Sequence, residues 1–430
     1  MKRIVAILLL TMTLSDLMAQ GGSGVYVGGH IRRERPGTIT KLKNSGFTYA
    51  ILFNVNVEPD GTLTTDGETI CRDGEYVFAN EQPHYVEDVQ TLKAWPTSIG
   101  RIEICIGGWG NESYIRIRDL INRDGIGQNT ILYRNFKALK EAIPEIDAVN
   151  NDDEHCYDVA TAVKFHVMMR SLGYKTTIAP YTNWNFWNDL VTQVNQTRPG
   201  TCDRVMIQCY DGGANNNPSD WHLGGLPLHA GRTNYQSDMQ TSIGQMEQWR
   251  DQNDVVGGFV WVYNDETWNL NQWASAMNRV FPSKTSEEPA ATFYSDKNFS
   301  GYAITLSEGM YGTGELAAYG ITDKDIESYK MLPDYRLTVY ANADLTGSSK
   351  EYTEAESARM GAWANRISSL KIEKTQVPTT IGEFADDGEN TLETTIPLGS
   401  QWQMKVVGKA DGTVKKVISR CRLTQPTTLH

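Results

Sequence analysis

The chain has 430 residues, of which 40% are hydrophobic and 21% are charged, and its formal net charge is −12. This length predicts two or three domains, and the composition is typical of globular proteins. The acidic balance argues against nucleic acid or an anionic membrane surface as a partner, because both bind basic surfaces.

The N-terminus has the pattern of a secretory leader. Lys2 and Arg3 precede an apolar run at 4–10, and Ala19 is the small residue that cleavage requires. The apolar run is too short to cross a bilayer as a stable anchor. We therefore predict a signal peptide over 1–19, no membrane span, and a mature protein that is secreted, periplasmic or bound at the cell surface.

The region 24–281 alternates between strand-like and helix-like segments. Short apolar or β-branched runs predict eight strands, at 25–30, 49–55, 101–108, 146–151, 176–181, 205–211, 227–231 and 257–263. Helical periodicity is clearest at 129–143, 159–173, 239–252 and 270–281. This repetition predicts an α/β fold, a (β/α)8 TIM barrel. A doubly wound open sheet is the alternative, although no G-x-G-x-x-G turn follows the first strand.

The pattern changes after a polar linker at 282–291. Two segments then repeat about 46 residues apart, "YSDKNFSG" from Tyr294 and "YANADLTG" from Tyr340. Each has a tyrosine, a large apolar residue five positions later and a glycine two positions after that. This pattern resembles the corner of the βγ-crystallins, and the resemblance implies a small all-β Greek-key domain over 292–374.

Residues 375–430 follow as a β extension of unknown type. Within it, strand-like runs at 400–408 and 413–423 flank the sequence "KADG". An Asp-Gly pair between two such runs predicts a hairpin.

An acidic stretch, "IDAVNNDDEHCYD" from Ile146 to Asp158, lies at the end of the fourth predicted barrel strand. Neighbouring like charges repel, so one interpretation is a solvated loop. The other is a group of catalytic carboxylates at the carboxyl end of a buried strand, where barrels carry their active sites. Because alternate strand residues share a face, Asn150, Asp152 and Glu154 are predicted to point together into the barrel mouth. This alternation favours the second interpretation, a group of catalytic carboxylates.

These residues resemble the fourth-strand motif D-G-x-D-x-D-x-E of glycoside hydrolase family 18, the chitinases and endo-β-N-acetylglucosaminidases. Three further strands are similar to the family, "CIGGW" (105–109), "MIQCYD" (206–211) and "GFVWVYN" (258–264). The resemblance covers about 24–281. It implies hydrolysis of β-1,4-linked N-acetylglucosamine, in the N-glycan core or in chitin, with the substrate's own acetamido oxygen as nucleophile.

The resemblance also implies roles for single residues. Glu154 is the general acid and base, Asp152 stabilises the acetamido-derived intermediate, and Tyr210 donates to the acetamido carbonyl. Asn150 completes the predicted catalytic set. Substrate contacts are predicted for Gln208, Trp261, Trp109 and Trp184. No cofactor is implied, the partner is an oligosaccharide or a glycoprotein glycan, and we expect a monomer.

Two departures from the family pattern leave other interpretations open. Asn150 and Asn151 stand where the family has an aspartate and an apolar residue. A lectin-like carbohydrate-binding protein with little or no turnover is therefore the alternative to an enzyme, and a structural or adhesive protein is a third. Long loops expected at 56–95 and 211–226, with the "DDE" ending, favour a branched N-glycan over chitin. Trp184 is equally compatible with packing against the next helix.

Many βγ-crystallins bind Ca²⁺ through N/D-N/D-x-x-S/T-S, one motif in each unit. The matching stretches here are "DKDIES" (323–328) and "ANRISS" (364–369), and each has lost one expected residue. A structural role is therefore expected for this domain. A weak Ca²⁺ site is the most that the motifs predict, and it would use Asp323, Glu327, Asn365 and Ser368.

Overall fold

The structure, a computed structural model, describes residues 21–33, 35–264, 268–282 and 288–375 and the backbone of four later strands. The predicted signal peptide and half of the predicted linker lie outside the described residues. The chain divides into two compact units. The first comprises Met1–Thr285 with Tyr311–Asp323, and the second comprises Ser286–Met310 with Lys324–His430.

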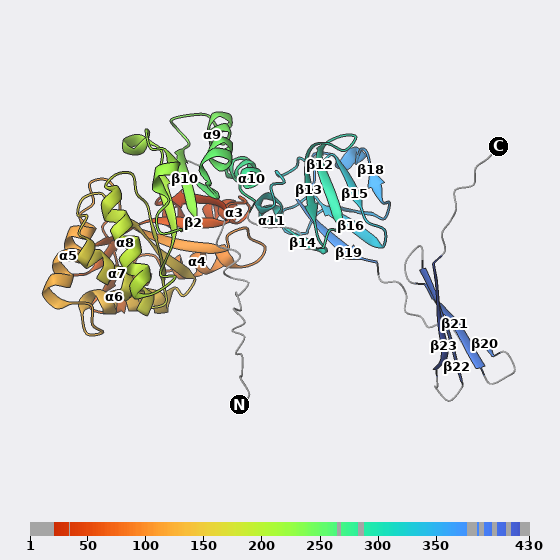
Figure 1. Cartoon of the computed structure of the whole chain (residues 1–430), viewed down its shortest axis with the longest axis horizontal. Coiled ribbons are helices and arrows are strands. Elements are labelled where there is room, and N and C mark those ends of the chain that lie inside the picture. The colour runs from red at the N-terminus through yellow and green to blue at the C-terminus, as the bar shows by residue number, and fades with distance from the viewer. Residues whose placement is uncertain are drawn as a thin grey trace, which may run out of the picture. The chain divides into compact units, whose positions relative to one another are not determined.

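Eight parallel strands form a closed barrel in the first unit (Figure 1). In spatial order they are β1 (Gly22–Val27), β11 (Gly257–Tyr263), β10 (Leu228–Thr233), β9 (Cys202–Gln208), β8 (Lys175–Ile178), β7 (Ile146–Asp152), β6 (Arg101–Gly107) and β2 (Tyr49–Val57). Strand β1 pairs with both β11 and β2, which closes the ring. The eight predicted strands are confirmed. The open-sheet alternative is wrong, because β1 and β2 leave no unpaired edge.

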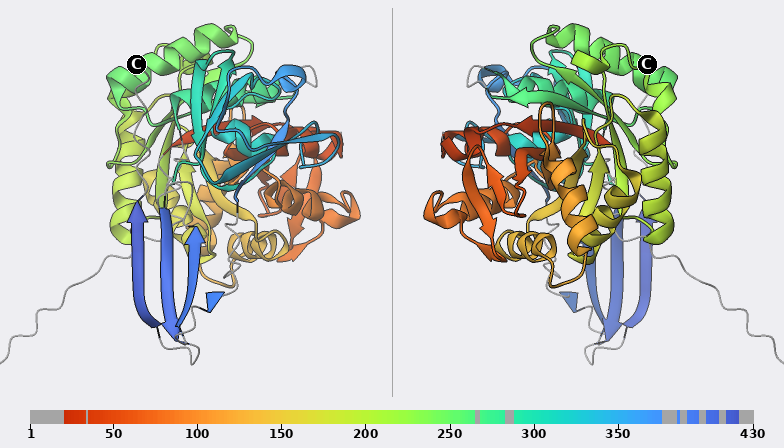
Figure 2. Two further views of the ribbon diagram at one scale, coloured as in Figure 1. Left: turned by 90° about the vertical axis from the view of Figure 1, so that its right-hand side faces the viewer. Right: turned by 90° about the vertical axis from the view of Figure 1, so that its left-hand side faces the viewer.

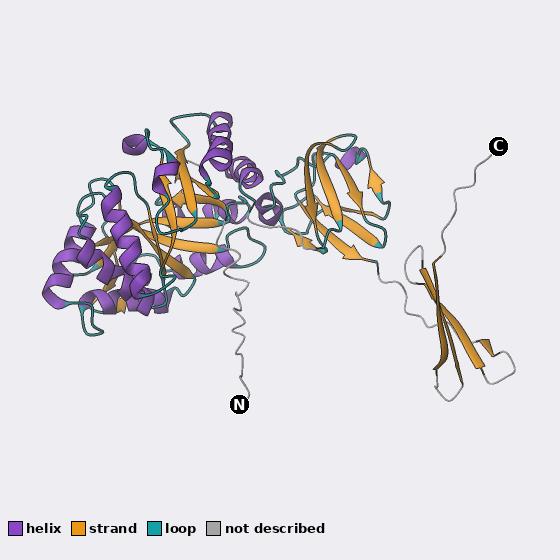
Figure 3. Cartoon of the chain, in the orientation of Figure 1, coloured by secondary structure: helices purple, strands orange, loops and turns teal. Residues whose placement is uncertain are grey.

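Helices follow the strands and lie outside them (Figure 3). They are α2 (His30–Arg33), α3 (Gly37–Lys43), α4 (Tyr85–Lys93), α5 (Ser113–Asp124), α6 (Ile131–Ala142), α7 (Val159–Ser171), α8 (Trp184–Thr197), α9 (Met239–Asn253) and α10 (Leu270–Val280). The four predicted helices are confirmed as α6, α7, α9 and α10. Each of these four starts after a side chain that accepts a hydrogen bond from the third helical N–H, Thr130, Asp158, Asp238 and Asn269 respectively.

The connection after β2 differs from the long loop expected over 56–95. It contains the antiparallel strands β3 (Leu63–Thr65), β4 (Glu68–Arg72) and β5 (Glu75–Tyr76), the 3₁₀ helix η1 (Phe78–Asn80) and α4. The turns are the pairs Asp66-Gly67 and Asp73-Gly74, and all four residues have positive φ. Asp-Gly is a strong hairpin signal for this reason, so the sequence did contain the evidence for this ribbon.

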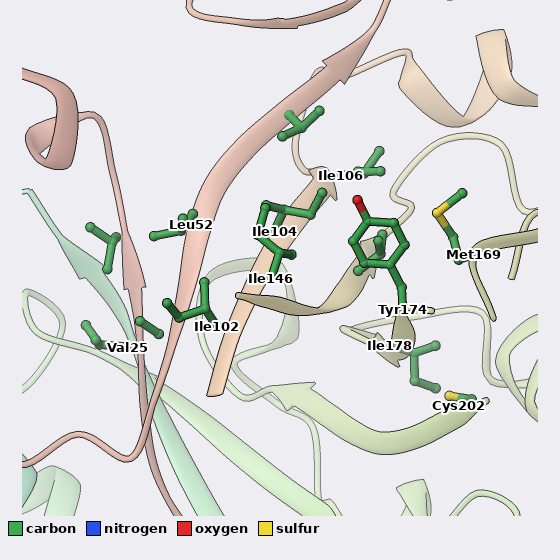
Figure 4. Close-up of a cluster of buried hydrophobic side chains, with 14 of the residues drawn as sticks. Val25, Leu52, Ile102, Ile104, Ile106, Ile146, Met169, Tyr174, Ile178 and Cys202 are labelled. Atoms are coloured by element: carbon green, nitrogen blue, oxygen red, sulfur yellow. The ribbon is translucent and has the colours of Figure 1, made fainter. Parts of the chain in front are cut away.

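Strand alternation separates two layers of buried side chains. On β6, Ile102, Ile104 and Ile106 belong to the layer between strands and helices, together with Met169 and Tyr174 (Figure 4). A second cluster fills the barrel interior with Tyr26, Tyr49, Ile51, Cys105, Met206, Tyr210, Phe259 and Val262. The interior is therefore a packed core, and a site can form only above it, at the carboxyl ends of the strands.

Two four-stranded antiparallel sheets build the β domain. The first has the order β13 (Ser300–Leu306), β12 (Ala291–Asp296), β15 (Ser328–Met331) and β18 (Glu356–Ser357). The second has the order β14 (Gly309–Tyr311), β19 (Ser369–Lys374), β16 (Tyr335–Tyr340) and β17 (Ser349–Tyr352). Each predicted repeat gives three strands to one sheet and one strand, β14 or β18, to the other. This exchange is the Greek-key arrangement expected from the sequence.

The repeated corners of this domain have the same hydrogen bonds. Phe299 and Leu345 have φ values of 60° and 61°. Each donates its backbone N–H to a serine hydroxyl, Ser328 at 3.1 Å and Ser369 at 3.0 Å. Both serines donate in turn to a backbone carbonyl of their corner, at 2.6 Å. The repeat seen in the sequence is therefore a repeat in structure.

Two short helices complete this region of the chain, α11 (Thr313–Ala318), which groups with the first unit, and η4 (Gly361–Trp363).

The backbone beyond 375 forms another antiparallel sheet, blue in Figure 2, of β20 (Ala385–Asp386), β21 (Thr391–Pro397), β22 (Trp402–Lys409) and β23 (Val414–Cys421). Strands β22 and β23 are the predicted hairpin. Among the helices that the structure describes, none combines the length and the apolar character that a bilayer span requires.

Candidate functional site

A cavity of about 630 Å³ opens where the carboxyl ends of the barrel strands meet. Its lining consists of Phe53, Gly108, Trp109, Asp152, Glu154, Tyr181, Gln208, Tyr210, Asp211, Gly212 and Trp261. Six of the eight residues predicted from the sequence are in this set. They come from β6, β7, β9 and β11 or from the residues that directly follow these strands, so barrel closure brings them together.

Two acidic side chains from β7 occupy the centre of the site. Asp152 is 5% exposed, and its Oδ1 accepts a hydrogen bond of 2.9 Å from Gln208 Nε2. Gln208 also lowers the pKa of the Glu154 carboxyl group. The same amide nitrogen donates to the carbonyl oxygen of Ala179, again at 2.9 Å, which holds its orientation. Both Nε2 protons of Gln208 are therefore used, and the amide has a fixed orientation beside Asp152.

Burial perturbs both acids in the same direction. It raises the pKa of Glu154 to about 7, with a smaller contribution from the charge of Asp153 and a counteracting one from Gln208. Burial also raises the pKa of Asp152 well above its ordinary value, and the charges of Glu154 and Asp153 add to this effect. A carboxylic acid that keeps its proton near neutral pH can act as a general acid.

The third acid of the cluster, Asp153, points away from the cavity and stabilises the loop after β7. Its carboxylate accepts backbone N–H groups from His155, Cys156 and Tyr157, at 3.0, 2.8 and 2.8 Å. Asn151 also lies on this outer side, with its Nδ2 2.9 Å from His166 Nε2. The alternation predicted for the acidic stretch is therefore correct, since 150, 152 and 154 face one way and 151 and 153 the other.

Two glycines explain why β6 can approach β7 so closely at the site. Gly107 and Gly108 have φ values of 110° and 98°. A Cβ on Gly107 would lie 2.1 Å from the carbonyl oxygen of Asp152, and the N–H of Gly108 donates to that oxygen at 2.7 Å. Any larger residue would push β7 away and displace Asp152.

Aromatic rings form one wall of the cavity. The ring centroids of Trp261 and Phe53 are 4.7 Å apart and the two planes are nearly perpendicular, and Tyr26 packs beneath at 5.2 Å from Trp261. Trp109 is 84% exposed and lies 5.9 Å from the ring of His155. A flat apolar surface beside acidic groups can hold a ligand that has both an apolar face and hydrogen-bonding groups.

Tyr210 and Asp211 also line the cavity. Tyr210 is buried against Phe259, and burial raises the pKa of its hydroxyl well above the usual value, so it is a neutral donor. The Asp211 carboxylate accepts hydrogen bonds from Tyr235 at 2.6 Å and Gln236 at 2.5 Å.

Two predicted site residues lie outside the cavity. Asn150 is completely buried below it and bonds to Tyr26 and Thr177, so it has no direct access to a ligand in the cavity. Trp184 begins α8, is 42% exposed, and its Nε1 donates to the carbonyl oxygen of Asp220 at 2.7 Å. Their positions do not support the catalytic role predicted for Asn150 or the substrate contact predicted for Trp184.

Three side chains of the lining were not singled out from the sequence. Phe53 shares the inward face of β2 with Tyr49 and Ile51, so strand alternation was a sufficient signal for it. Tyr181 and Asp211 end the predicted strands 176–181 and 205–211. Barrel sites form at the carboxyl ends of the strands, so this rule was a sufficient signal for both residues.

Two of the four residues of the predicted weak Ca²⁺ site, Glu327 and Asn365, are hydrogen-bonded to each other. Glu327 accepts a hydrogen bond from Asn365 at 2.8 Å, and Lys297 lies 3.8 Å from its carboxylate. The N–H of Asp323 donates to Asn271, and Ser368 is buried. Within the described ranges, no three His, Cys, Asp or Glu side chains are grouped so that they could hold a metal ion.

Comparison with known proteins finds relatives for part of the chain. No family model matches it. A development-specific protein S homolog of Myxococcus xanthus is 27% identical over 128 residues, which are 29% of this chain and 73% of that protein. Development-specific protein S of the same organism is 26% identical over 128 residues, which are again 29% of this chain and 73% of that protein.

Solved structures give corresponding matches. The N-terminal domain of protein S is 28% identical, with a TM-score of 0.19, and the match covers 20% of this chain and 96% of that domain. A βγ-crystallin domain from Clostridium beijerinckii is 31% identical, with a TM-score of 0.19, over 19% of this chain and 95% of that one. The exchanged strands of the two sheets and the similarity to the Myxococcus proteins confirm a βγ-crystallin-like domain.

Proposed function

We propose that the protein is a secreted glycoside hydrolase of the family 18 type that cleaves β-1,4-linked N-acetylglucosamine. The observation that carries this proposal is the pair Asp152 and Glu154, which lie with Gln208 in an aromatic-walled cavity. The barrel would then be a TIM barrel with its site in the usual place. The βγ-crystallin-like domain is a structural module in this proposal.

In this mechanism Glu154 donates its proton to the glycosidic oxygen while the bond from that oxygen to the anomeric carbon breaks. The acetamido oxygen of the substrate attacks the same carbon and forms an oxazolinium intermediate. Asp152 accepts a hydrogen bond from the acetamido N–H, and Tyr210 donates to the acetamido oxygen. Water then opens the ring as Glu154 takes its proton.

The preferred substrate in this proposal is the core of an N-glycan. The "DDE" ending of the β7 motif supports this choice. Chitin is the alternative substrate, and a carbohydrate-binding protein with little turnover is the alternative function. Buried Asn150 favours the latter, because an amide replaces the carboxylate that the resemblance leads one to expect there.

The test is incubation with a high-mannose glycoprotein and, separately, with chitooligosaccharides, followed by mass analysis of the products. Released glycans that retain one N-acetylglucosamine at the reducing end, with the other left on the protein, are the expected result. Shortened chitooligosaccharides alone would make the protein a chitinase. Intact substrates in both reactions, with glycan binding seen by calorimetry, would establish the lectin-like alternative.

A further inference from the structure

A chain of buried hydrogen bonds crosses the barrel interior beneath the cavity. The Tyr26 hydroxyl is 2.9 Å from Asn150 Oδ1, Asn150 Nδ2 is 2.8 Å from the Thr177 hydroxyl, and that hydroxyl is 2.5 Å from Glu103 Oε2. Asn150, Thr177 and Glu103 are completely buried. The second oxygen of Glu103 accepts from Arg101 Nε at 2.7 Å. We call this set, from Arg101 to Tyr26, the relay.

The relay has only one possible direction. Glu103 is ion-paired with Arg101, so it is a carboxylate that can only accept hydrogen bonds. The single proton of the Thr177 hydroxyl must therefore point to Glu103, and its oxygen must accept from position 150. Asn150 meets this need with its NH₂ group, which turns its carbonyl oxygen toward the Tyr26 hydroxyl. The orientation of the Asn150 amide is therefore fixed by the groups that surround it.

We propose that Glu103 and Thr177 are positioning residues of the site, and that their hydrogen-bond direction makes an amide the side chain that fits at position 150. The relay ends on Tyr26, whose ring packs against Trp261 and Phe53 of the cavity wall. Position 150 has no carboxylate, but Glu103 supplies one nearby. Glu103 lies on β6, two residues before Cys105, which is the residue that pairs with Asn150.

An aspartate at 150 would face Thr177 with an oxygen instead of an N–H. One hydroxyl proton would then be required by two carboxylates, unless the new aspartate kept its own proton. Other titratable groups around this position are Tyr26 on β1, Cys105 on β6 and Asp152 on β7, and Arg204 on β9 lies 4.0 Å from Glu103. Among these neighbours the nearby acid, Asp152, disfavours a second charge still further.

The test exchanges the two groups. Asn150→Asp alone and Glu103→Gln alone each leave one mismatched pair in the relay. In the double variant every bond can reform in reverse: Arg101 donates to the new amide oxygen, the new NH₂ donates to Thr177, and Thr177 donates to the new carboxylate. Arg101 keeps Asp203, which it contacts at 2.8 and 2.9 Å.

Folding equilibrium constants from denaturant titration are the first readout. Each single variant is expected to lower the constant about tenfold or more, the effect of one unsatisfied buried polar group. The double variant is expected to be at least as stable as the better single variant. Additive losses, or single variants as stable as wild type, would overturn the proposal. If a single variant gives no soluble protein, recovery of soluble protein in the double variant takes the place of this readout, and no recovery counts against the relay.

Two further arms separate positioning from simple packing. The loss caused by Asn150→Asp should grow from pH 5 to pH 8, because an acid whose folded pKa is raised destabilises the fold as pH rises. The double variant should no longer recover stability when Thr177→Val is added, because the hydroxyl is lost. With Thr177→Ser added, the recovery should remain. A rescue that survives Thr177→Val, or a loss that is independent of pH, would contradict the assigned direction.

The consequence for catalysis rests on the proposed function. In the double variant a carboxylate lies on the same face of β7 as Asp152, so the alkaline limb of the pH–rate profile should move to higher pH. An unchanged profile, with the stability rescue present, would confine the relay to folding and refute its role in the site. If wild type hydrolyses nothing, the proposed function fails, while the stability arms still decide whether the relay exists.

Discussion

Gln208 Nε2 lies 2.9 Å from Asp152 Oδ1, although the two residues are 56 positions apart in the chain. The contact joins β9 to β7 across the strand β8 between them, and it exists because both side chains point into the barrel. This neutral amide lowers the pKa of Asp152 and of Glu154 without adding a charge of its own. The balance of protons at the site therefore depends on this amide.

Replacement of Glu154 by glutamine should abolish most hydrolysis and leave glycan binding nearly intact. Loss of one general acid lowers the rate roughly 10²–10⁴-fold. The measurement is kcat on a glycan with a good leaving group and on one with a poor one, where the loss should be larger. Glu247→Gln, at an exposed position on α9, is the matched control. Turnover equal to wild type would mean that another residue supplies the proton.

The pH dependence of stability should also change in Glu154→Gln. The folded pKa of about 7 is above the ordinary carboxyl value. At pH values between these two pKa values, the folded state therefore binds more protons than the unfolded state. Stability linked to this group is present below the unfolded pKa and is lost as pH rises through about 7. The variant lacks this loss, so its melting temperature relative to wild type should rise between pH 4 and pH 8, on the order of 2 °C. A difference that is the same at both pH values would contradict the raised pKa.

Gln208→Leu should move the alkaline limb of the pH–rate profile to higher pH. The substitution removes the amide that lowers the pKa values of Asp152 and Glu154, while burial still raises both. The test is kcat/KM from pH 4 to pH 10. A shift to lower pH would show that Gln208 does not stabilise the charged acids.

Asp153→Ala should destabilise the fold more than any other single change in the acidic stretch. Three backbone N–H groups would lose their acceptor, which costs about 2–4 kcal/mol when the hydrogen bonds are to a charged group. Denaturant unfolding measures this. The control is Asp124→Ala, at a surface acid paired with its neighbour Arg123, which should change stability far less. Equal effects of the two substitutions would refute the role given to Asp153.

Millimolar Ca²⁺ should raise the melting temperature of the intact protein by less than about 1 °C. The Glu327 carboxylate already accepts from Asn365 and lies near Lys297, so a cation would have to displace both. A rise of about 5 °C or more that disappears in Glu327→Gln would establish a Ca²⁺ site.

The sequence was sufficient for those features that have a local cause. The alternation of 150, 152 and 154 follows from strand geometry alone, and the capping residues that begin α6, α7, α9 and α10 precede their helices directly. The repeated corners of the β domain were visible because the same backbone conformation requires the same residues twice.

Only the tertiary structure decided which side chains meet. Strand alternation places Asn150 on the same face of β7 as the site residues. It is nevertheless buried beneath the cavity, in a hydrogen-bonded chain with Tyr26, Thr177 and Glu103 from three other strands. Trp184 follows a barrel strand, yet its indole N–H is directed to Asp220. Closure of the barrel sets these distances, because it places strands remote in sequence side by side, and the direction of a buried hydrogen bond depends on every group that shares it.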